Sequence, residues 1–527
     1  MKRRNFLKAA AVGGAAAAAS VSMKTRRASA VPLFGDVPAE HASVMLPKEN
    51  QVTNILECFM YGGITPWEGF YCVPEYGSET AKTWHKAYPN DFLNAATACS
   101  YTDPGLFTPF AKDSEGRDIF LSPFLKPLTA RTDLTDRMRV VVNRHSLEPH
   151  EAAIPLTMSG ATLGSPSLAS LGAHVSRYFV DHDLESKHPS PFGYGLIGSG
   201  GFISPDNVLT MLATGLHPGS ARPLHVKMND VARLNALINR TPIGSLDDRA
   251  RYDALLSTYF GQYQNRLKFA STGDSLRAPR FGEMSAAANS LAHAREIQEL
   301  FEPKYLAAIS SPSCRSRVGS GANASTISTS PPTVVAANYP AMSLKMAVHL
   351  LTHPTAPAAH CMVVDAGFIQ ADGGGGYDTH SETPFTQARN LKAFFDGLLP
   401  LVNAPGESDP EKLDLNKTMI IMNMEFGRTP GLQNTTNTGR NHWPYGYTQV
   451  YIGGPITNAQ RGVYGVIPQS GQASVYTTPT ENRIAALLAM GIWPFDSSSY
   501  SSASVQESGS ESLAVRSVLK RVLGYTV

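Results

Sequence analysis

Residues 361–380 read CMVVDAGFIQADGGGGYDTH, and residues 417–444 read KTMIIMNMEFGRTPGLQNTTNTGRNHWP. Each stretch begins with an apolar run of strand length, at Cys361–Asp365 and Met419–Met424, and each run leads into a Gly-rich or polar turn. In an open α/β sheet, ligands bind in the crevice beyond the carboxyl ends of the strands. The acidic, basic and imidazole side chains of these turns therefore predict a functional site at one edge of a sheet, with a metal site as the first hypothesis.

The chain around these stretches alternates between helix and strand patterns. Ala341–Leu351 and Glu382–Val402 have helical patterns and flank the first strand, and Thr448–Gly453 is a further apolar run of strand length. Such alternation indicates a mainly parallel sheet with right-handed crossover connections. The predicted fold class is therefore α/β.

Two earlier predicted strands place more candidate residues at the same edge. Val52–Met60 ends at a Tyr-Gly-Gly turn, and Glu68 lies just beyond it. A carboxylate after the first strand of such a sheet can be a metal ligand, although an isolated one is more often a solvated loop residue. The second strand, Arg137–Asn143, is followed by RHSLEPHE.

In that segment, Pro149 indicates the start of a helix. Helix N-termini attract anions through their free N–H groups and the helix dipole. His145, Ser146 and His150 are thus candidates for handling a charged substrate. A cap or a surface group is the more frequent role of a single His or Ser at such a position.

The Gly-rich turn carries Asp378 and His380 two residues apart, after four glycines that let the backbone bend tightly. Oxygen and nitrogen donors of this kind suit zinc, manganese or iron, whereas calcium would need more oxygen ligands. The alternative is an Asx-turn at Asp378 beside a surface histidine.

The second turn adds Glu425, Arg428, Arg440 and His442. Glu425 follows a predicted strand and is a candidate metal ligand, or else an ordinary carboxylate paired with Arg428. Arg428 and Arg440 could grip the oxygens of an anionic group. His442 stands between Arg440 and a Trp-Pro pair, where a half-buried ring without a ligand role is common. The metal hypothesis rests on the whole set at successive strand ends.

The N-terminus predicts export. Residues 2–8 read KRRNFLK, an Ala- and Gly-rich stretch follows, and Ala28-Ser29-Ala30 is a cleavage pattern, so residues 1–30 are interpreted as a twin-arginine signal peptide. Later stretches are too short for a membrane span, and we expect no stable membrane anchor. The mature protein is expected to be periplasmic or secreted, with the twin-arginine translocase as its partner during export.

The composition describes a globular protein without a nucleic-acid partner. The hydrophobic content is 42% and the net charge is +2, and basic stripes with interleaved aromatic residues are not evident. Residues 31–527 are interpreted as one α/β domain, with a helical insertion or cap at about 189–330. The five cysteines have irregular spacing, which permits one or two disulfides but predicts no pairing.

Four motifs resemble those of an uncharacterised bacterial family, usually twin-arginine exported, within the alkaline-phosphatase and sulfatase-like superfamily. They are GGYDTH at 375–380, EFGRTP at 425–430, GRNHWP at 439–444 and GVYG at 462–465. The resemblance implies a mainly parallel sheet sandwiched by helices. It implies a divalent metal, zinc or manganese, as one ion or two, near Asp378, His380, Glu425, His442 and Glu68. This chain departs from the family with Glu68, Tyr377 and Asn441, and with Glu425-Phe426 where characterised members of the superfamily have an Asp-His pair, which counts against a second ion.

The resemblance also implies a metal-dependent hydrolase of phosphate or sulfate esters, acting on a small anionic ester or glycan. Ser146 is then the first candidate nucleophile and His150 the next, while Arg428 or Arg440 would steady the anionic oxygens. The alternative is a catalytically degenerate, metal-containing envelope protein that binds anionic glycans or partners. A metal-free serine hydrolase is the weakest hypothesis, because the chain has no G-x-S-x-G motif.

Overall fold

The computed structural model describes most of the α/β core. The described residues are 33–77, 90–99, 107–165, 168–182, 184, 187, 193–198, 224–227, 251, 254–255, 258–259, 262, 314, 317–318, 326–327, 339–365, 376–380, 383–433, 439–497 and 499–527. The predicted signal peptide and most of the predicted insertion at 189–330 lie outside them. Within that predicted helical insertion, however, residues 194–198 and 224–227 are strands of the main sheet and not part of a helical cap.

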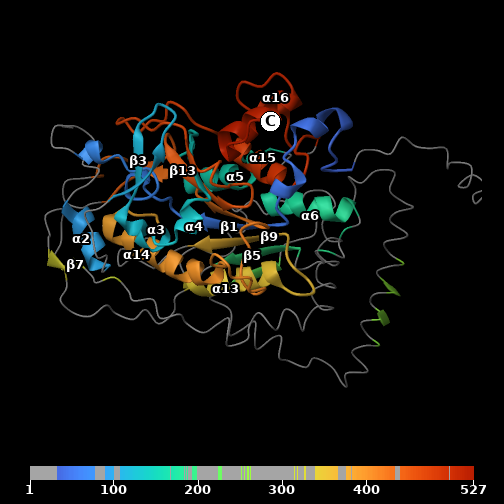
Figure 1. Ribbon diagram of the computed structural model, residues 1–527, viewed down its shortest axis with the longest axis horizontal. Helices are drawn as coiled ribbons and strands as arrows, with labels where there is room; N and C mark the ends of the chain where they lie inside the picture. Colours follow the sequence, from blue (N-terminus) through green and yellow to red (C-terminus); the bar gives the residue numbers. More distant parts are fainter. Residues whose placement is uncertain are drawn as a thin grey trace, which may run out of the picture.

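Within these residues, the main sheet has eight strands in the order β14-β4-β13-β10-β1-β9-β5-β6 (Figure 1). All neighbouring strands are parallel except β13, which is antiparallel to β10 and to β4. The predicted α/β class with a mainly parallel sheet is therefore confirmed. The strands are β1 (Asn54–Met60), β4 (Met138–Asn143), β5 (Tyr194–Gly198), β6 (Leu224–Lys227), β9 (His360–Asp365), β10 (Thr418–Asn423), β13 (Tyr447–Gly453) and β14 (Gly462–Tyr464).

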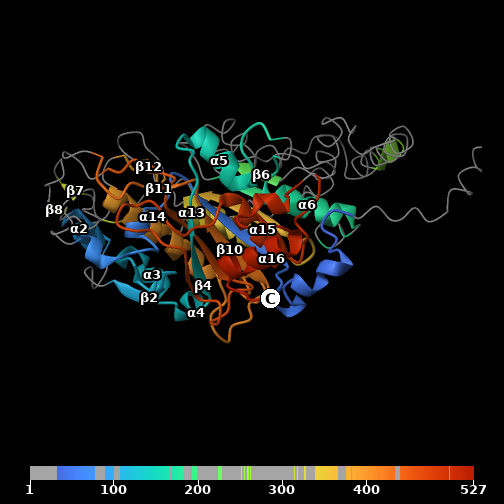
Figure 2. The same ribbon diagram turned by 90° about the horizontal axis from the view of Figure 1, so that it is seen from above.

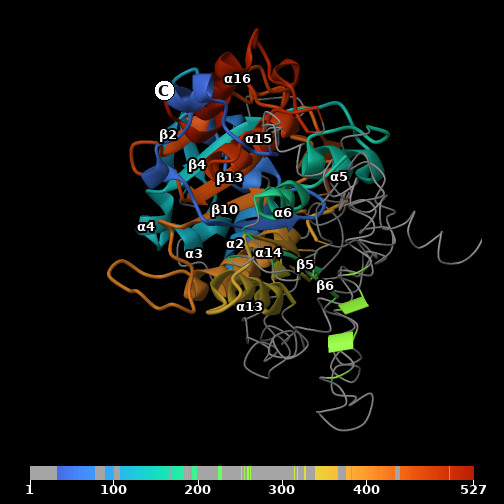
Figure 3. The same cartoon turned by 90° about the vertical axis from the view of Figure 1, so that its right-hand side faces the viewer.

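Helices cover both faces of this sheet (Figures 1 and 3). One layer contains α2 (Asn90–Ala98), α3 (Lys126–Thr129), α13 (Tyr339–Thr352) and α14 (Thr383–Leu398). The other contains α5 (His150–Ser159), α6 (Leu171–Asp181), α15 (Pro479–Ala489) and α16 (Glu511–Val518). Because both faces are covered, the central strands are nearly continuous apolar runs, which is why they are recognisable in the sequence.

Shorter elements complete the described fold. Three small two-stranded sheets pair β2 (Thr108–Lys112) with β3 (Asp118–Leu121), β7 (Arg317–Val318) with β8 (Thr326–Ile327), and β11 (Gly427–Arg428) with β12 (His442–Trp443). A four-residue helix, α4 (Thr132–Thr135), precedes β4, and the 3-10 helix η1 (Ala39–Val44) packs against α16 (Figure 2). No helix in the described part of the chain is long and apolar enough to cross a membrane.

The central strand β1 contains one buried charge. Leu56 and Cys58 face the α13–α14 layer, whereas Glu57 points towards α15 and is fully buried. Its carboxylate accepts hydrogen bonds from Arg483 at 2.6 Å and from Asn423 at 2.8 Å, and His360 lies 3.1 Å away. Burial alone would raise the pKa of Glu57, but Arg483 and His360 lower it to about 2.

A disulfide joins the end of α2 to the middle of the chain. Cys99 is bonded to Cys314, 215 residues later, whereas Cys58, Cys72 and Cys361 are buried thiols that are not part of a disulfide. A bond between such distant residues restricts the unfolded chain, which stabilises the native state.

Candidate metal centre

Loops from several strands meet at one edge of the main sheet. β1, β9 and β10 are parallel neighbours, and β4 runs in their direction because β4 and β10 are both antiparallel to β13. The loops after β9 and β10 carry Asp378 and Glu425. The loop after β4 leads to His150, which is the first residue of α5. His442 lies on β12, which precedes β13, so it reaches the same edge.

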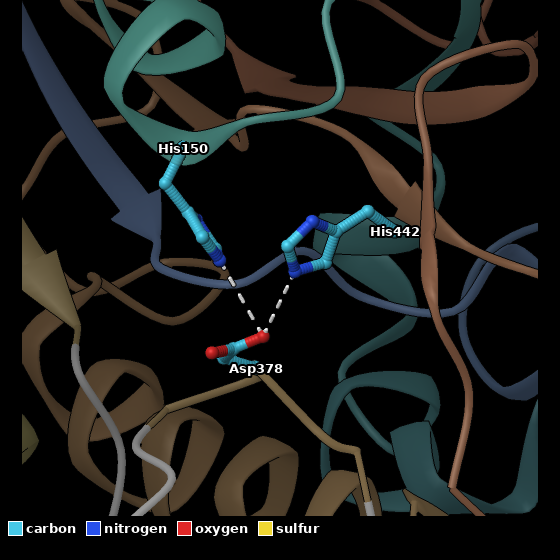
Figure 4. Close-up of side chains that lie close together, drawn as sticks. All are labelled: His150, Asp378 and His442. Atoms are coloured by element: carbon cyan, nitrogen blue, oxygen red, sulfur yellow. Dashed lines mark ion pairs between the residues drawn. The ribbon is translucent and has the colours of Figure 1, made fainter. Parts of the chain in front are cut away.

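One oxygen of Asp378 is the centre of this cluster. Asp378 Oδ1 lies 3.0 Å from His380 Nε2, 3.4 Å from His442 Nε2 and 3.5 Å from His150 Nε2. Figure 4 shows the rings of His150 and His442 directed at this carboxylate. Metal ligands in proteins are mostly His, Cys, Asp and Glu side chains. In the part of the chain that the structure describes, His150, Asp378 and His442 are the one group of three such side chains whose ligand atoms lie close enough together to share an ion.

The outer nitrogen of each ring faces an acceptor. His150 Nδ1 is 2.9 Å from Glu425 Oε1, His442 Nδ1 is 3.1 Å from the Glu148 carbonyl, and His380 Nδ1 is 3.3 Å from Gln433 Oε1. Carboxylate, carbonyl and amide oxygens accept hydrogen bonds and do not donate them. Each neutral ring therefore carries its proton on Nδ1. The three Nε2 lone pairs are consequently directed inward, which is how histidines are held in metal centres.

The local charge favours a cation. Glu425 and Asp378 carry two negative charges and Arg428 carries one positive charge, which leaves one negative charge when the imidazoles are neutral. Burial alone would lower the pKa of His150, but hydrogen bonds to Asp378 and Glu425 raise it to about 9, so without a metal this ring holds a second proton at neutral pH, and a bound cation would displace that proton. Burial alone would raise the pKa of Asp378, but the three histidines and Arg428 bring it well below its usual range. The carboxylate is therefore ionised and attracts a positive charge.

Glu425 lies behind His150, not beside Asp378. It is fully buried, and its Oε1 accepts the His150 Nδ1 proton and, at 2.7 Å, the N–H of Gly62. It is predicted as a direct ligand, whereas the structure places it on the far side of the ring. The reason is that the chain turns inward directly after β10, so that this side chain points into the core.

Arg428 holds Asp378 in place. Its guanidinium is fully buried and donates to Asp378 Oδ1 at 2.5 Å, to the Gly62 carbonyl and to the Arg440 carbonyl. Pairing of β11 with β12 sets Arg428 opposite His442. The predicted role of gripping a substrate anion does not fit a buried group whose donors already have partners.

Glu68 and Arg440 form a separate buried pair. Both side chains are fully buried, and Arg440 donates to Glu68 Oε1 from Nε at 3.1 Å and from Nη2 at 2.8 Å. Burial raises the pKa of Glu68, and Arg440 opposes that shift. Glu68 is predicted as a ligand and Arg440 as an anion-binding group. The structure instead uses each to neutralise the other, because the loop after β1 folds into the 3-10 helix η3 (Pro66–Glu68) and is covered.

Ser146 and His145 are not in the cluster. Ser146 is exposed, and none of the contacts seen among the described residues joins it to Asp378. His145 Nε2 donates to the Glu425 carbonyl at 2.6 Å and its Nδ1 accepts from Leu147 N–H at 3.1 Å. Burial lowers the pKa of His145 to about 4, so the ring is neutral and supports the main chain at Glu425.

Three neighbours of the cluster have no counterpart among the sequence-based candidates. The Tyr61 ring stacks on His150 with centroids 5.0 Å apart, and Phe426 stacks on His442 at 4.4 Å. Gly62 touches the backbone of Asp378. The available signal was the Tyr-Gly-Gly turn after β1, since a glycine at a ligand-bearing strand end often permits close approach of another backbone.

The comparisons with known sequences add a family model of limited extent. A model described as "Protein of unknown function (DUF1501)" matches residues 257–490, which include Asp378, His380, Glu425 and His442 but not His150. No curated protein matches this chain.

Proposed function

We propose that the protein is an exported, metal-dependent hydrolase of phosphate or sulfate esters. In this proposal His150, Asp378 and His442 hold one divalent ion, and the adjacent His380 is the fourth candidate ligand. The observation that carries it is the convergence of three Nε2 atoms on Asp378 Oδ1 while each Nδ1 faces an acceptor. Three nitrogens and one oxygen suit zinc, manganese or iron. Glu68 and Glu425 are engaged elsewhere, which supports one ion over two.

A divalent ion held there would lower the pKa of a bound water and neutralise charge on the transferring group. The protein's own residues prepare the site for this. Arg428 orients Asp378, Glu425 keeps the His150 proton on Nδ1, and Phe426 and Tyr61 cover the rings. Because Ser146 is exposed and apart from the cluster, we favour a water nucleophile over a serine nucleophile.

We further propose that the protein belongs to the alkaline-phosphatase and sulfatase-like superfamily. Its support is a mainly parallel sheet between two helical layers, together with candidate ligands beyond the carboxyl ends of the strands. The GGYDTH, EFGRTP and GRNHWP motifs supply Asp378, His380, Arg428, Glu425 and His442 to the cluster. The Cys99–Cys314 disulfide favours an oxidising compartment, which suits periplasmic or secreted localisation by the twin-arginine route.

A second candidate is a metal-containing envelope protein without catalytic activity. The buried guanidinium groups of Arg428 and Arg440 favour it, because neither is open to an anionic substrate. Anionic glycans or protein partners would then bind by other residues.

The deciding experiment measures metal content and hydrolysis on the mature protein. We expect about one equivalent of a divalent metal per chain and hydrolysis of an aryl phosphate or aryl sulfate. His380→Ala and His442→Ala should lose metal and activity. His182→Ala is the control, because that ring pairs with Asp36 away from the cluster. Metal without turnover would favour the second candidate, and turnover unaffected by His380→Ala would remove this site from the reaction.

A further inference from the structure

The peptide of Gly62 connects the two residues that support the candidate ligands. Its N–H donates to Glu425 Oε1 at 2.7 Å, and its carbonyl accepts from Arg428 Nε at 2.7 Å and from Arg428 Nη2. Glu425 in turn contacts His150, and Arg428 contacts Asp378. The contacts therefore form one continuous path from His150 to Asp378.

The backbone at this point permits no other residue without a shift. Gly62 has φ of +93°, and a Cβ atom there would lie 1.9 Å from Asp378 N and 2.4 Å from Asp378 Cα. The neighbouring residues are also joined, since Tyr377 N–H donates to the Tyr61 carbonyl at 2.7 Å. The turn after β1 is thus pressed directly against the turn that carries Asp378.

We infer that Glu425 is a positioning residue of the proposed metal centre, acting on His150 directly and on Asp378 through the Gly62 peptide and Arg428. This inference rests on the proposed function. Glu425 contacts the Nδ1 edge of the imidazole, whereas the atoms that converge are Nε2 and Asp378 Oδ1. By accepting the Nδ1 proton, the carboxylate leaves the Nε2 lone pair free for a cation.

Glu68 offers a matched control. It is also a fully buried glutamate that accepts from an arginine, but its partner is Arg440 and it does not contact the three histidines in the described structure. Replacing either glutamate by glutamine removes one buried charge with almost no change in volume. A difference in metal affinity between the two variants therefore results from the contact of Glu425 with His150, and not from the general effect of losing a buried charge.

The experiment is a Co²⁺ titration of mature protein stripped of metal, followed by the visible absorption of the bound ion. We expect Glu425→Gln, which keeps an acceptor oxygen, to weaken Co²⁺ binding by about tenfold, and Glu425→Ala by up to about 100-fold. Glu68→Gln should bind like wild type. The absorption band of Glu425→Gln at saturation should match wild type, because the ligand atoms are unchanged, whereas His150→Ala should shift it.

The outcomes separate this inference from the proposed function. A wild-type protein that binds no Co²⁺ overturns the metal centre itself, and the inference with it. If the wild type binds Co²⁺ and both Glu425 variants bind it with the same affinity, only the positioning role is overturned. A Glu425→Gln band shifted as in His150→Ala would make Glu425 a direct ligand and also overturn it. Thermal melting of the metal-free variants checks that Glu425→Gln and Glu68→Gln are equally folded.

Discussion

His380 Nε2 and His442 Nε2 lie 3.2 Å apart, and both are within 3.4 Å of Asp378 Oδ1. Each ring directs its Nδ1 to an oxygen acceptor, so the two inner nitrogens present lone pairs to each other. Two lone pairs at this distance repel unless a positive charge lies between or beside them. A proton or a metal ion satisfies this geometry, and the two can be distinguished by experiment.

The first prediction concerns metal removal. Because a ligand that binds only the native state stabilises it, a free metal concentration 100 times Kd should add about 2.7 kcal/mol to the free energy of unfolding. Treatment with a chelator should therefore lower Tm, and added zinc or manganese should restore it. In His442→Ala the metal-dependent change in Tm should disappear, whereas His182→Ala should retain it. If neither the chelator nor added metal changes the Tm of the wild type, a proton and not a metal ion lies between the two histidines.

The second prediction concerns the glycine between the supporting residues. Gly62→Ala should lower the free energy of unfolding by several kcal/mol and abolish high-affinity metal binding, because its Cβ would meet the Asp378 backbone. Gly116→Ala is the control, since Gly116 has a similar φ of +84° but no atom within 4 Å of the added Cβ. It should cost only about 1–2 kcal/mol, the penalty of the left-handed backbone. Urea unfolding measures both, and equal losses would contradict the close approach.

The third prediction concerns the buried ion pair of β1 and α15. Glu57→Leu or Arg483→Met alone leaves one buried charge without its partner and should cost about 3–5 kcal/mol. The double variant should be more stable than either single variant, because no buried charge remains. The exposed Lys112–Asp118 pair is the comparison, with an expected coupling of at most about 1 kcal/mol. Additive losses at Glu57 and Arg483 in a double-mutant cycle would contradict this prediction.

The fourth prediction concerns acid stability. Burial alone would raise the pKa of Glu57, but Arg483 and His360 lower it to about 2 from its ordinary value of 4.5. Since the folded-state pKa is the lower one, ionised Glu57 stabilises the protein above about pH 4.5, and this contribution is lost as the pH falls towards about 2. Glu57→Gln lacks the titrating group. Its urea midpoint should therefore fall less steeply than that of wild type across this interval, and parallel curves would contradict the assignment.

Strands β1, β4, β9, β10 and β13 were predictable to within about two residues because they are buried on both faces, whereas β5, β6 and β14 were not predicted. The run Cys361–Asp365 is observed as His360–Asp365, and Met419–Met424 as Thr418–Asn423. The prediction of Glu382–Val402 as a helix compares with the observed Thr383–Leu398. Buried apolar runs and helical periods are local properties, so they can be recognised without knowing what packs against them.

The roles of individual charged residues could not be recognised in that way. Arg440 and Arg428 each follow a single glycine directly, yet one neutralises Glu68 and the other holds Asp378. Glu425 and Asp378 are both carboxylates after parallel strands, yet one supports a ring and the other is the centre of the cluster. Such roles depend on which group lies within about 3 Å, and that group is often distant along the chain: Glu425 and His150 are 275 positions apart, and Arg440 and Glu68 are 372 positions apart.

The sequence alone determined the α/β class, the mainly parallel sheet and the edge of the sheet at which polar groups collect. These features depend on burial patterns along short segments. The choice of Asp378 as the centre, the inward direction of three imidazoles and the support by Glu425 through Gly62 follow from the packed chain. A tautomer or an ion pair is set by distances between atoms, and only the folding of β1, β4, β9 and β10 into one sheet brings these atoms within reach.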